Sequence, residues 1–293
     1  MNLDDLVAIH ALDPQNMLAE IDGLPDQLQA AWSLGQRLAL PAWQGLTRVV
    51  VAGMGGSAIG ADLLAAYAAP ACPLPVFVHR DYGLPAWARG PETLVIASSH
   101  SGNTEETLSA FSHALQHGCT CLAVCTGGKL AASAHKAGVP VWTFVHRGQP
   151  RAAVGYSFGL LLAVFVRLGL LPDPAAELAA ALAAMRRQQE TLRAEVPAVQ
   201  NPAKRQGGQL MGRWVSVMGA DILAPVARRW KGQVSELAKA WAQFEFLPEA
   251  DHNTLAGTSN PEELFGRAIT LFLLAPSYSP HNALRTRLTM KAF

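Results

Sequence analysis

The chain has 293 residues and a mass of 31.2 kDa, more than one hydrophobic core usually serves, so we expect two domains. Half of the residues are hydrophobic and 15% are charged, a composition that excludes a disordered protein. The 23 basic and 22 acidic residues leave a formal net charge of +1, so no global charge favours nucleic acid or an anionic membrane as a partner.

The first elements of the chain predict the opening of a βαβ unit. Met1–Asp5 is acidic and polar where a signal peptide would be basic and then apolar, so export is not expected. After a helical lead-in over residues 1–44, a strand is predicted at Arg48–Ala52 and ends at the glycine cluster Gly53–Gly56. Ser57–Tyr67 then has helical spacing, which completes a strand–turn–helix pattern.

The rest of the first half alternates short apolar strands with helical segments. Strands are predicted at Val76–Val78, Thr93–Ala97, Cys121–Cys125 and Val141–Phe144, with a helix at Thr104–His117. This alternation predicts a parallel sheet that is covered by helices on both faces.

One segment, Val154–Leu171, is almost wholly apolar. A membrane span and a helix buried between domains or subunits both explain such a run. Because Ser157 and Gly159 lie within it and Arg167 lies near its end, we interpret the segment as core.

The second half of the chain repeats the first in outline. Pro172–Pro174 is typical of a hinge, and a helix is predicted over residues 175–196. Strands are predicted at Arg213–Met218 and Ala268–Leu274, in the same order and with the same type of following loop as in the first half. The expected fold class is α/β, with two tandem doubly wound domains at residues 1–172 and 173–293.

Two loops in the first half carry the strongest chemical signal. They are Gly53–Ser57 and Ser98–Thr104, and each leaves a strand and enters a helix, where unpaired backbone N–H groups and the helix dipole favour an anion. Glycines let the backbone approach the anion closely, and hydroxyl groups add hydrogen-bond donors. We therefore predict a phosphate site, and the absence of a Gly-Lys-Ser/Thr triplet distinguishes it from a nucleoside-triphosphate loop.

Two other interpretations of these loops stay open at the level of the sequence. Ser101 and Thr104 could form a turn and a helix cap without any ligand. Gly53–Ala58 also fits a dinucleotide fingerprint, with Asp81 as the acid for the ribose of a nicotinamide cofactor. A dinucleotide-binding fold, however, has no use for a second hydroxyl-rich loop.

A metal site is a further alternative. Cys119, Cys121 and Cys125 lie close in sequence, with His113 and His117 just upstream, and a Cys/His set can bind zinc. The spacings do not match the usual two-residue-gap pairs, and Cys121 and Cys125 fall in a strand that is predicted to be buried. Four cysteines in a chain of this size also do not make a disulfide framework, so we expect the cytoplasm.

The two loops together resemble a known family. Gly53–Ser57 followed by Ser99–Thr104 resembles the sugar isomerase (SIS) domain. Four further segments look like the bifunctional phosphoglucose/phosphomannose isomerase branch of that superfamily, namely Thr126–Leu130, Gln149–Ala153, Lys231–Lys239 and Leu247–Gly257. The resemblance runs from about residue 45 to the end and implies two tandem SIS-type domains with parallel sheets.

The resemblance also implies roles for individual positions. It implies substrate-phosphate binding for Gly55, Gly56, Ser57, Ser99, Ser101 and Thr104. Arg151 would stabilise the negative charge that develops on the substrate, and Glu236 would be the base that moves a proton between C2 and C1. His252 would open the sugar ring, and it would be donated across the interface of a homodimer.

The residue types fit these roles chemically. An enediolate intermediate needs a carboxylate that can take and return a proton, and a cation or N–H donors at the oxyanion. Apolar neighbours such as Leu237 and Trp241 would bury Glu236 and make it a stronger base. A histidine moves a hydroxyl proton near neutral pH, and no metal or redox cofactor is required.

Each of these side chains also has an ordinary explanation. Glu236 and Lys239 could form an i,i+3 ion pair on a solvated helix face, and Arg151 could be a surface arginine. His252 could belong to a turn with an Asx cap.

The chain departs from the family pattern in three places. Ser235 stands beside the expected base where we expect asparagine, and Asp251 precedes His252 where asparagine is common. Leu284–Leu288 resembles the family's penultimate helix, so with Phe293 as the last residue we expect the final strand and helix, and a catalytic lysine in them, to be missing. Lys291 lies too early to replace that lysine.

The implied function is the interconversion of glucose 6-phosphate and mannose 6-phosphate with fructose 6-phosphate through an enediol. We expect a hexose 6-phosphate as substrate, no cofactor, no metal, and no nucleic acid or membrane as partner. The alternative is a non-catalytic SIS protein that binds a sugar phosphate as a sensor or regulator, which a missing C-terminal segment would favour.

Overall fold

The computed structural model describes residues 2–293. The chain forms two compact units, the first ending at Pro197 and the second beginning at Ala198. The strands of the first unit are β1 (Arg48–Ala52), β2 (Val76–His79), β3 (Thr93–Ser99), β4 (Thr120–Cys125) and β5 (Val141–Thr143). Its helices are α1 (Leu6–Leu12), α2 (Met17–Asp22), α3 (Leu24–Gly35), α4 (Gly55–Ala68), α5 (Glu105–Gln116), α6 (Gly128–Lys136), the 3-10 helix η1 (Pro150–Ala152), α7 (Val154–Arg167) and α8 (Ala175–Leu192).

The first unit contains the predicted parallel sheet. Its five strands lie in the order β2-β1-β3-β4-β5, and every pair is parallel. Each predicted strand of this half is present, with ends that differ from the prediction by one or two residues. The α/β fold class with a parallel sheet and flanking helices is therefore confirmed.

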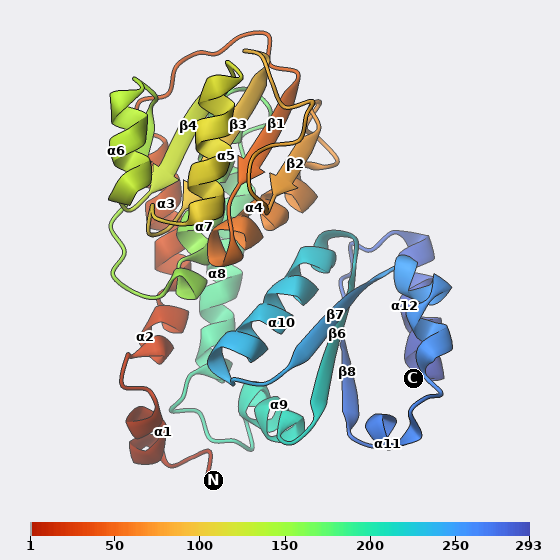
Figure 1. Cartoon of the computed structure of the whole chain (residues 1–293). Coiled ribbons are helices and arrows are strands. Elements are labelled where there is room, and N and C mark those ends of the chain that lie inside the picture. The colour runs from red at the N-terminus through yellow and green to blue at the C-terminus, as the bar shows by residue number, and fades with distance from the viewer. Residues whose placement is uncertain (1) are drawn as a thin grey trace. The chain divides into compact units, whose positions relative to one another are not determined.

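Alternate residues of the strands feed two separate apolar cores, one on each face of the sheet. Val49 and Val51 of β1 pack in the core that α4 and α7 cover, whereas Val50 and Ala52 pack in the core beneath α5 and α6. Figure 1 shows α5 and α6 on one face and α3, α4 and α7 behind the sheet. Such burial on both faces explains why the strands are continuous apolar runs.

The apolar segment Val154–Leu171 forms α7 and the turn after it, and it is core as predicted. Two of its glycines permit close approach to α3: a Cβ at Gly159 would lie 2.8 Å from the Cβ of Ala31, and one at Gly155 would lie 2.9 Å from the backbone nitrogen of Leu28. Within residues 2–293, no helix is both long and apolar enough to cross a membrane.

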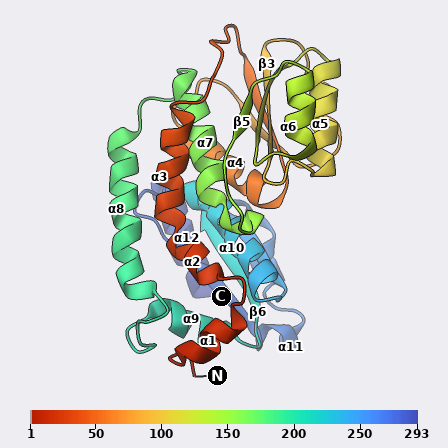
Figure 2. The ribbon, with the colours of Figure 1, turned by 90° about the vertical axis from the view of Figure 1, so that its left-hand side faces the viewer.

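Helix α8 explains why the first unit extends past the expected domain boundary at residues 172/173. Leu178 and Leu182 of α8 form a small apolar cluster with Leu28 of α3, and Arg186 donates a hydrogen bond to Asp26 at 2.9 Å. Figure 2 shows α8 running alongside α3. The helix therefore packs on the first unit, and the units divide after Pro197.

The second unit repeats the central strand arrangement of the first. Its elements are α9 (Pro202–Leu210), β6 (Trp214–Ala220), η2 (Asp221–Leu223), α10 (Ala224–Leu237), β7 (Ala242–Leu247), η3 (Glu249–His252), η4 (Thr254–Gly257), α11 (Glu262–Phe265), β8 (Ala268–Phe272) and α12 (Pro280–Ala292). The parallel order β7-β6-β8 places the first strand of the unit between the next two, as β1 lies between β2 and β3. The tandem repeat of two SIS-type domains remains a prediction.

The predicted burial of the β4 cysteines is confirmed. Cys121 is 5% exposed and Cys125 is fully buried, and both pack among the apolar side chains beneath α5 and α6. Burial raises the pKa of the Cys121 thiol to about 12, and the neighbouring Cys119 acts in the same direction. Burial also raises the pKa of Cys125.

These thiols should resist alkylation while the chain is folded. At pH 8 a raised pKa lowers the thiolate population, so we expect Cys121 to react with iodoacetamide about 1,000-fold more slowly than an unperturbed thiol, with steric protection added. Mass spectrometry of timed digests measures the rate, and the same protein in guanidinium is the control. Equal rates in both conditions would contradict the burial described above.

Candidate functional site

The loops that follow β1 and β3 open at the same edge of the first sheet. Because β2 and β3 pair with opposite sides of β1, the direction of strand order reverses between β1 and β3. Helix α4 begins at Gly55 and α5 at Glu105, and the two helices cover opposite faces. Open α/β sheets bind ligands at such a switch point, outside the carboxyl ends of the strands.

Hydroxyl groups from both loops make hydrogen bonds to the second loop. The Oγ of Ser99 lies 2.9 Å from the Oγ1 of Thr104 and accepts a hydrogen bond from the N–H of Gly102 at 3.1 Å. The Oγ of Ser57 accepts a hydrogen bond from the N–H of His100, also at 3.1 Å. Ser57 and Ser99 are 7% and 2% exposed, so these hydroxyls are fixed by the fold rather than by solvent.

The helix-cap interpretation fails for Thr104 and holds in part for Ser101. Thr104 is the N-cap residue of α5, but its side chain makes no capping hydrogen bond and pairs with Ser99 instead. The exposed Ser101 accepts a hydrogen bond from the N–H of Asn103 at 3.2 Å, as a turn would require. Met54, the N-cap residue of α4, also provides no side-chain cap, so neither helix start is closed by its own cap.

The run Thr126–Leu130 contacts the second loop through hydrogen bonds to backbone carbonyls of that loop. The Oγ1 of Thr126 donates to the carbonyl of His100 at 2.7 Å, and the N–H of Leu130 donates to the carbonyl of Gly102 at 2.8 Å. Gly102 has a φ of +65°, and a Cβ there would overlap the carbonyl oxygen of Gly127. Only glycine therefore fits this position without movement of one loop.

Arg151 lies in the short helix η1, which packs against the start of α4. A Cβ at Gly56 would overlap the carbonyl oxygen of Pro150 and would lie 3.3 Å from the backbone nitrogen of Arg151. The Oγ of Ser157 donates to the carbonyl of Gly56 at 3.1 Å and holds α7 to the same turn. The predicted site residues of the first unit therefore come from one neighbourhood.

Glu236 lies in the last turn of α10 and is half-buried rather than enclosed. The apolar neighbours that were expected to bury it face solvent in the single chain, since Leu237 is 39% and Trp241 is 79% exposed. The expected burial is therefore only partial. The Nζ of Lys239 donates a hydrogen bond to the backbone carbonyl of Glu236 at 2.7 Å. Burial lowers the pKa of Arg229, and the Glu236 carboxylate offsets part of that effect.

His252 is the exposed last residue of η3. The residue before it, Asp251, accepts hydrogen bonds from Arg285 at 2.8 Å and Thr289 at 2.7 Å, which fastens η3 to α12. The Asx cap is formed by the residue after it, because the side chain of Asn253 accepts a hydrogen bond from the N–H of Thr254 at 2.5 Å. His252 itself is thus presented between two fixed neighbours.

Glu236 and His252 lie at opposite ends of the second sheet. α10 ends shortly before β7 begins, whereas η3 follows the end of β7. The six residues of β7 span about 20 Å at the usual rise of a strand. The structure therefore does not bring the two predicted catalytic side chains of one chain together.

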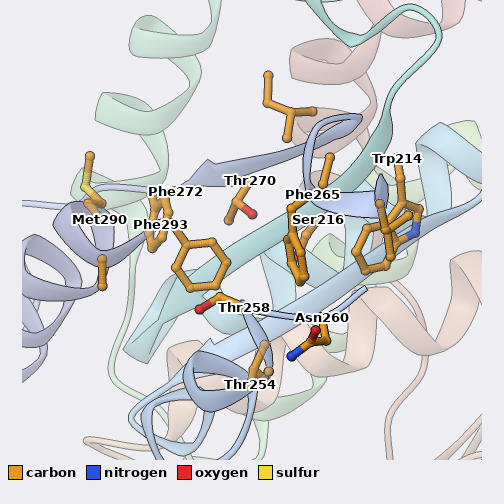
Figure 3. Close-up of a pocket in the computed structure, with 15 residues that line it drawn as sticks. Trp214, Ser216, Thr254, Thr258, Asn260, Phe265, Thr270, Phe272, Met290 and Phe293 are labelled. Atoms are coloured by element: carbon orange, nitrogen blue, oxygen red, sulfur yellow. The ribbon is translucent and has the colours of Figure 1, made fainter. Parts of the chain in front are cut away.

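A large apolar cavity of about 660 Å³ lies elsewhere in the second unit, beside β8. Figure 3 shows Phe272, Phe293 and Met290 at one end of this cavity and Trp214 at the other. Its polar lining consists mainly of Ser216, Thr254, Thr258, Asn260 and Thr270. None of the predicted site residues lines it.

The metal and nicotinamide alternatives receive no support from the described residues. Within residues 2–293, no group of three or more His, Cys, Asp or Glu side chains could hold a metal ion. His113 instead accepts a hydrogen bond from the N–H of Leu84 at 2.9 Å, with the His117 ring 4.1 Å away. The sheet order also differs from the 3-2-1-4-5-6 order of dinucleotide folds, and the exposed Asp81 accepts a hydrogen bond from the N–H of Tyr82.

Three polar residues at this edge of the first sheet were not predicted from the sequence. They are Glu20, His146 and Ser157, and they come from α2, the loop after β5, and α7. No local pattern marks any of them. His100 had a signal, because it lies between Ser99 and Ser101, but it was treated only as part of the loop.

Comparisons with known proteins agree with the resemblance stated above. Residues 199–293 match the family model of the bacterial phospho-glucose isomerase C-terminal SIS domain. The chain is 38% identical over 275 residues to the bifunctional phosphoglucose/phosphomannose isomerase of Caldicellulosiruptor bescii, covering 93% of this chain and 81% of the relative. It is 33% identical over 215 residues to the protein of the same name from Aquifex aeolicus, covering 73% of this chain and 63% of that relative.

The fold is shared more widely than the sequence. The C-terminal domain of glucosamine-fructose-6-phosphate aminotransferase from Francisella tularensis is similar with a TM-score of 0.66 at 12% identity, covering 94% of this chain and 80% of that chain. Identity this low shows the fold alone. On the strength of the closer relatives, the chain belongs to the bifunctional phosphoglucose/phosphomannose isomerase family.

Proposed function

We propose that this chain is an aldose–ketose isomerase that interconverts glucose 6-phosphate and mannose 6-phosphate with fructose 6-phosphate. The observation that carries the proposal is that the Ser57 hydroxyl and the Ser99–Thr104 hydroxyl pair lie at two helix starts without side-chain caps, in a member of this family. Buried hydroxyls and free helix N-termini suit a phosphate ester. A net charge of +1 is too small to attract an anion by itself, so local groups must hold the phosphate.

The phosphate would be bound by both loops. Backbone N–H groups of Gly55 and Gly56 and the hydroxyl of Ser57 would come from the start of α4. The hydroxyls of Ser99, Ser101 and Thr104 would come from the second loop. The Ser99–Thr104 pair supports this because hydroxyls that hydrogen-bond each other can turn toward an incoming anion without leaving buried groups unsatisfied.

The isomerisation would proceed through an enediol(ate). Glu236 would take the proton from C2 and return it to C1, and Arg151 would stabilise the oxyanion that forms. His252 would move the hydroxyl proton that opens the sugar ring. Glucose and mannose 6-phosphate differ only at C2, so both pass through the same enediol and one site serves both. The reaction needs neither a metal nor a redox cofactor.

A homodimer with His252 donated across the interface is part of the proposal. The separation of Glu236 and His252 by the length of β7 supports it, because one sugar cannot reach both side chains of the same chain. Two exposed apolar side chains, Leu237 and Trp241, lie near Glu236 in the sequence. Their exposure is also consistent with coverage by a partner subunit.

Two tandem SIS domains and a cytoplasmic location complete the proposal. The repeated strand order of the two sheets supports the tandem arrangement, and the family model for residues 199–293 supports the assignment of the second domain. Free Cys72, Cys119, Cys121 and Cys125 are consistent with a reducing compartment.

The substitution Thr104→Val tests the phosphate site. It removes one hydroxyl at nearly constant volume and costs α5 no cap, because this side chain does not cap the helix. We expect the affinity for glucose 6-phosphate to fall about 10-fold or more, as for the loss of one hydrogen bond to a charged group. Calorimetric titration measures it, with the exposed Thr47→Val as control. Unchanged affinity in Thr104→Val would remove this residue from the site.

The substitution Glu236→Gln tests the base. We expect fructose 6-phosphate formation from each aldose to fall about 100- to 10,000-fold while binding persists, the range typical of a lost general base. The exposed Glu263→Gln is the matched control and should retain activity. An unmodified chain that binds sugar phosphate but forms no product would instead support the sensor or regulator alternative.

Mixing two inactive variants tests the donation of His252. If Glu236 of one chain and His252 of the partner share a site, Glu236→Gln mixed with His252→Asn restores one intact site in each mixed dimer. Random pairing then gives about a quarter of the activity of the unmodified protein, since half of the dimers are mixed and each has one working site. No recovery after confirmed subunit exchange would place both residues of a site in the same chain.

A further inference from the structure

Three side chains from separate parts of the first unit form a continuous hydrogen-bonded chain beside the second loop. The Nε2 of His100 lies 2.9 Å from the Nδ1 of His146, and the Nε2 of His146 lies 2.9 Å from the Oε2 of Glu20. The side chain of His146 is 7% exposed and that of Glu20 is 26% exposed. This Glu20–His146–His100 relay links α2 with the loops that follow β5 and β3.

With Glu20 ionised and both imidazoles neutral, only one direction of the hydrogen bonds in the relay is possible. An ionised carboxylate only accepts, so the Nε2 of His146 donates to Glu20, and the Nδ1 of a neutral His146 must then accept. The Nε2 of His100 is therefore the donor to His146, and a neutral His100 carries no proton on Nδ1. This Nδ1 has no hydrogen-bond partner among the described residues, so it is the atom that can gain a proton.

His100 belongs to the second loop of the proposed phosphate site. Its backbone N–H donates to the Oγ of Ser57, and its neighbours on both sides are the site residues Ser99 and Ser101. His100 also lines a narrow pocket together with Gly56 and Ser57. His100 is therefore part of the loop that would bind the anion.

Without ligand, the surroundings disfavour a charge on this ring. Burial lowers the pKa of His100, the neighbouring His146 lowers it further, and Glu20 raises it. His146 and Glu20 are the titratable groups that act on the ring, and the Tyr156 ring lies 5.8 Å from the His146 ring. A phosphate dianion would add an opposite charge nearby, which favours the protonated imidazole.

We propose that His100 takes up a proton at Nδ1 when a phosphate ester binds, and that Glu20 and His146 are positioning residues that hold its tautomer and set the pH at which this occurs. The inference rests on the proposed phosphate site. The proton comes from solvent, no covalent bond forms or breaks, and the product is an imidazolium beside the bound dianion. Affinity then falls by up to about tenfold for each pH unit above the pKa of the free ring, until the pKa in the complex is passed.

Calorimetric titration with glucitol 6-phosphate tests this, because that ester has no carbonyl group and cannot be isomerised. At pH 7.5 the ester is almost fully dianionic, since the second pKa of a phosphate monoester is about 6. Titrations in HEPES and in Tris, whose ionisation enthalpies differ, count the protons exchanged. We expect uptake of up to about one proton per ligand in the unmodified protein and none in His100→Gln.

Two variants separate the relay from a merely structural role. Glu20→Gln keeps a hydrogen-bond acceptor for His146 but removes the charge, so the pH at which affinity begins to fall should move lower. His135→Gln, at an exposed histidine of α6, should leave both the proton count and the pH profile unchanged.

The outcomes are distinguishable. Binding without proton uptake in the unmodified protein would overturn this inference and leave the phosphate site standing. No binding of glucitol 6-phosphate at any accessible concentration would overturn both. Equal proton uptake in the unmodified protein and in His100→Gln would assign the proton to another group and overturn the role of His100. If His100→Gln does not fold by circular dichroism, the pH profile of Glu20→Gln decides.

Discussion

The parallel pairing of β1 with β3 is the constraint on which the candidate site depends. The chain leaves β1, forms β2 on one side, and returns to pair β3 on the other side. α4 and α5 therefore lie on opposite faces of the sheet while both begin at the same edge. Each helix start offers backbone N–H groups and a dipole that stabilises a nearby anion by about 0.3–1 kcal/mol. A nearly neutral protein thus acquires an electropositive spot without a cluster of lysines or arginines.

Close contacts at three glycine positions help to fix the groups around the two helix starts. The second loop lies on the Gly127 carbonyl, η1 lies on Gly56, and a Cβ at Gly60 of α4 would lie 2.5 Å from the Oγ of Ser157 in α7. Glycines at these contacts allow the neighbouring groups to approach closely, and close-packed interiors have low compressibility. The proposed roles require this rigidity, since oxyanion and phosphate contacts act through fixed distances.

The parts of this structure that could be predicted are those with local signals. The apolar strands, the glycine-rich turns and the core helix α7 were predicted because burial on both faces and tight turns leave their mark in consecutive residues. Long-range contacts left no such mark. The attachment of α8 to α3, the pairing of Ser99 with Thr104 instead of a cap, and the approach of Glu20 to His146 each depend on the assembled fold. The partial exposure of Glu236 was missed because apolar neighbours in a sequence do not show which way they face.

The contact of η3 with α12 explains, in physical terms, why an aspartate at position 251 fits this structure. Asp251 stands where the resemblance to the family leads us to expect asparagine, and its carboxylate accepts hydrogen bonds from Arg285 and Thr289. An asparagine would offer a single neutral oxygen and could not match the guanidinium charge. Positions 251 and 285 are therefore expected to have changed together during divergence, so that carriers of aspartate at the first should retain a cation at the second. Such a covarying pair would preserve the orientation of the His252 side chain in related proteins, although thirty-odd residues separate positions 251 and 285.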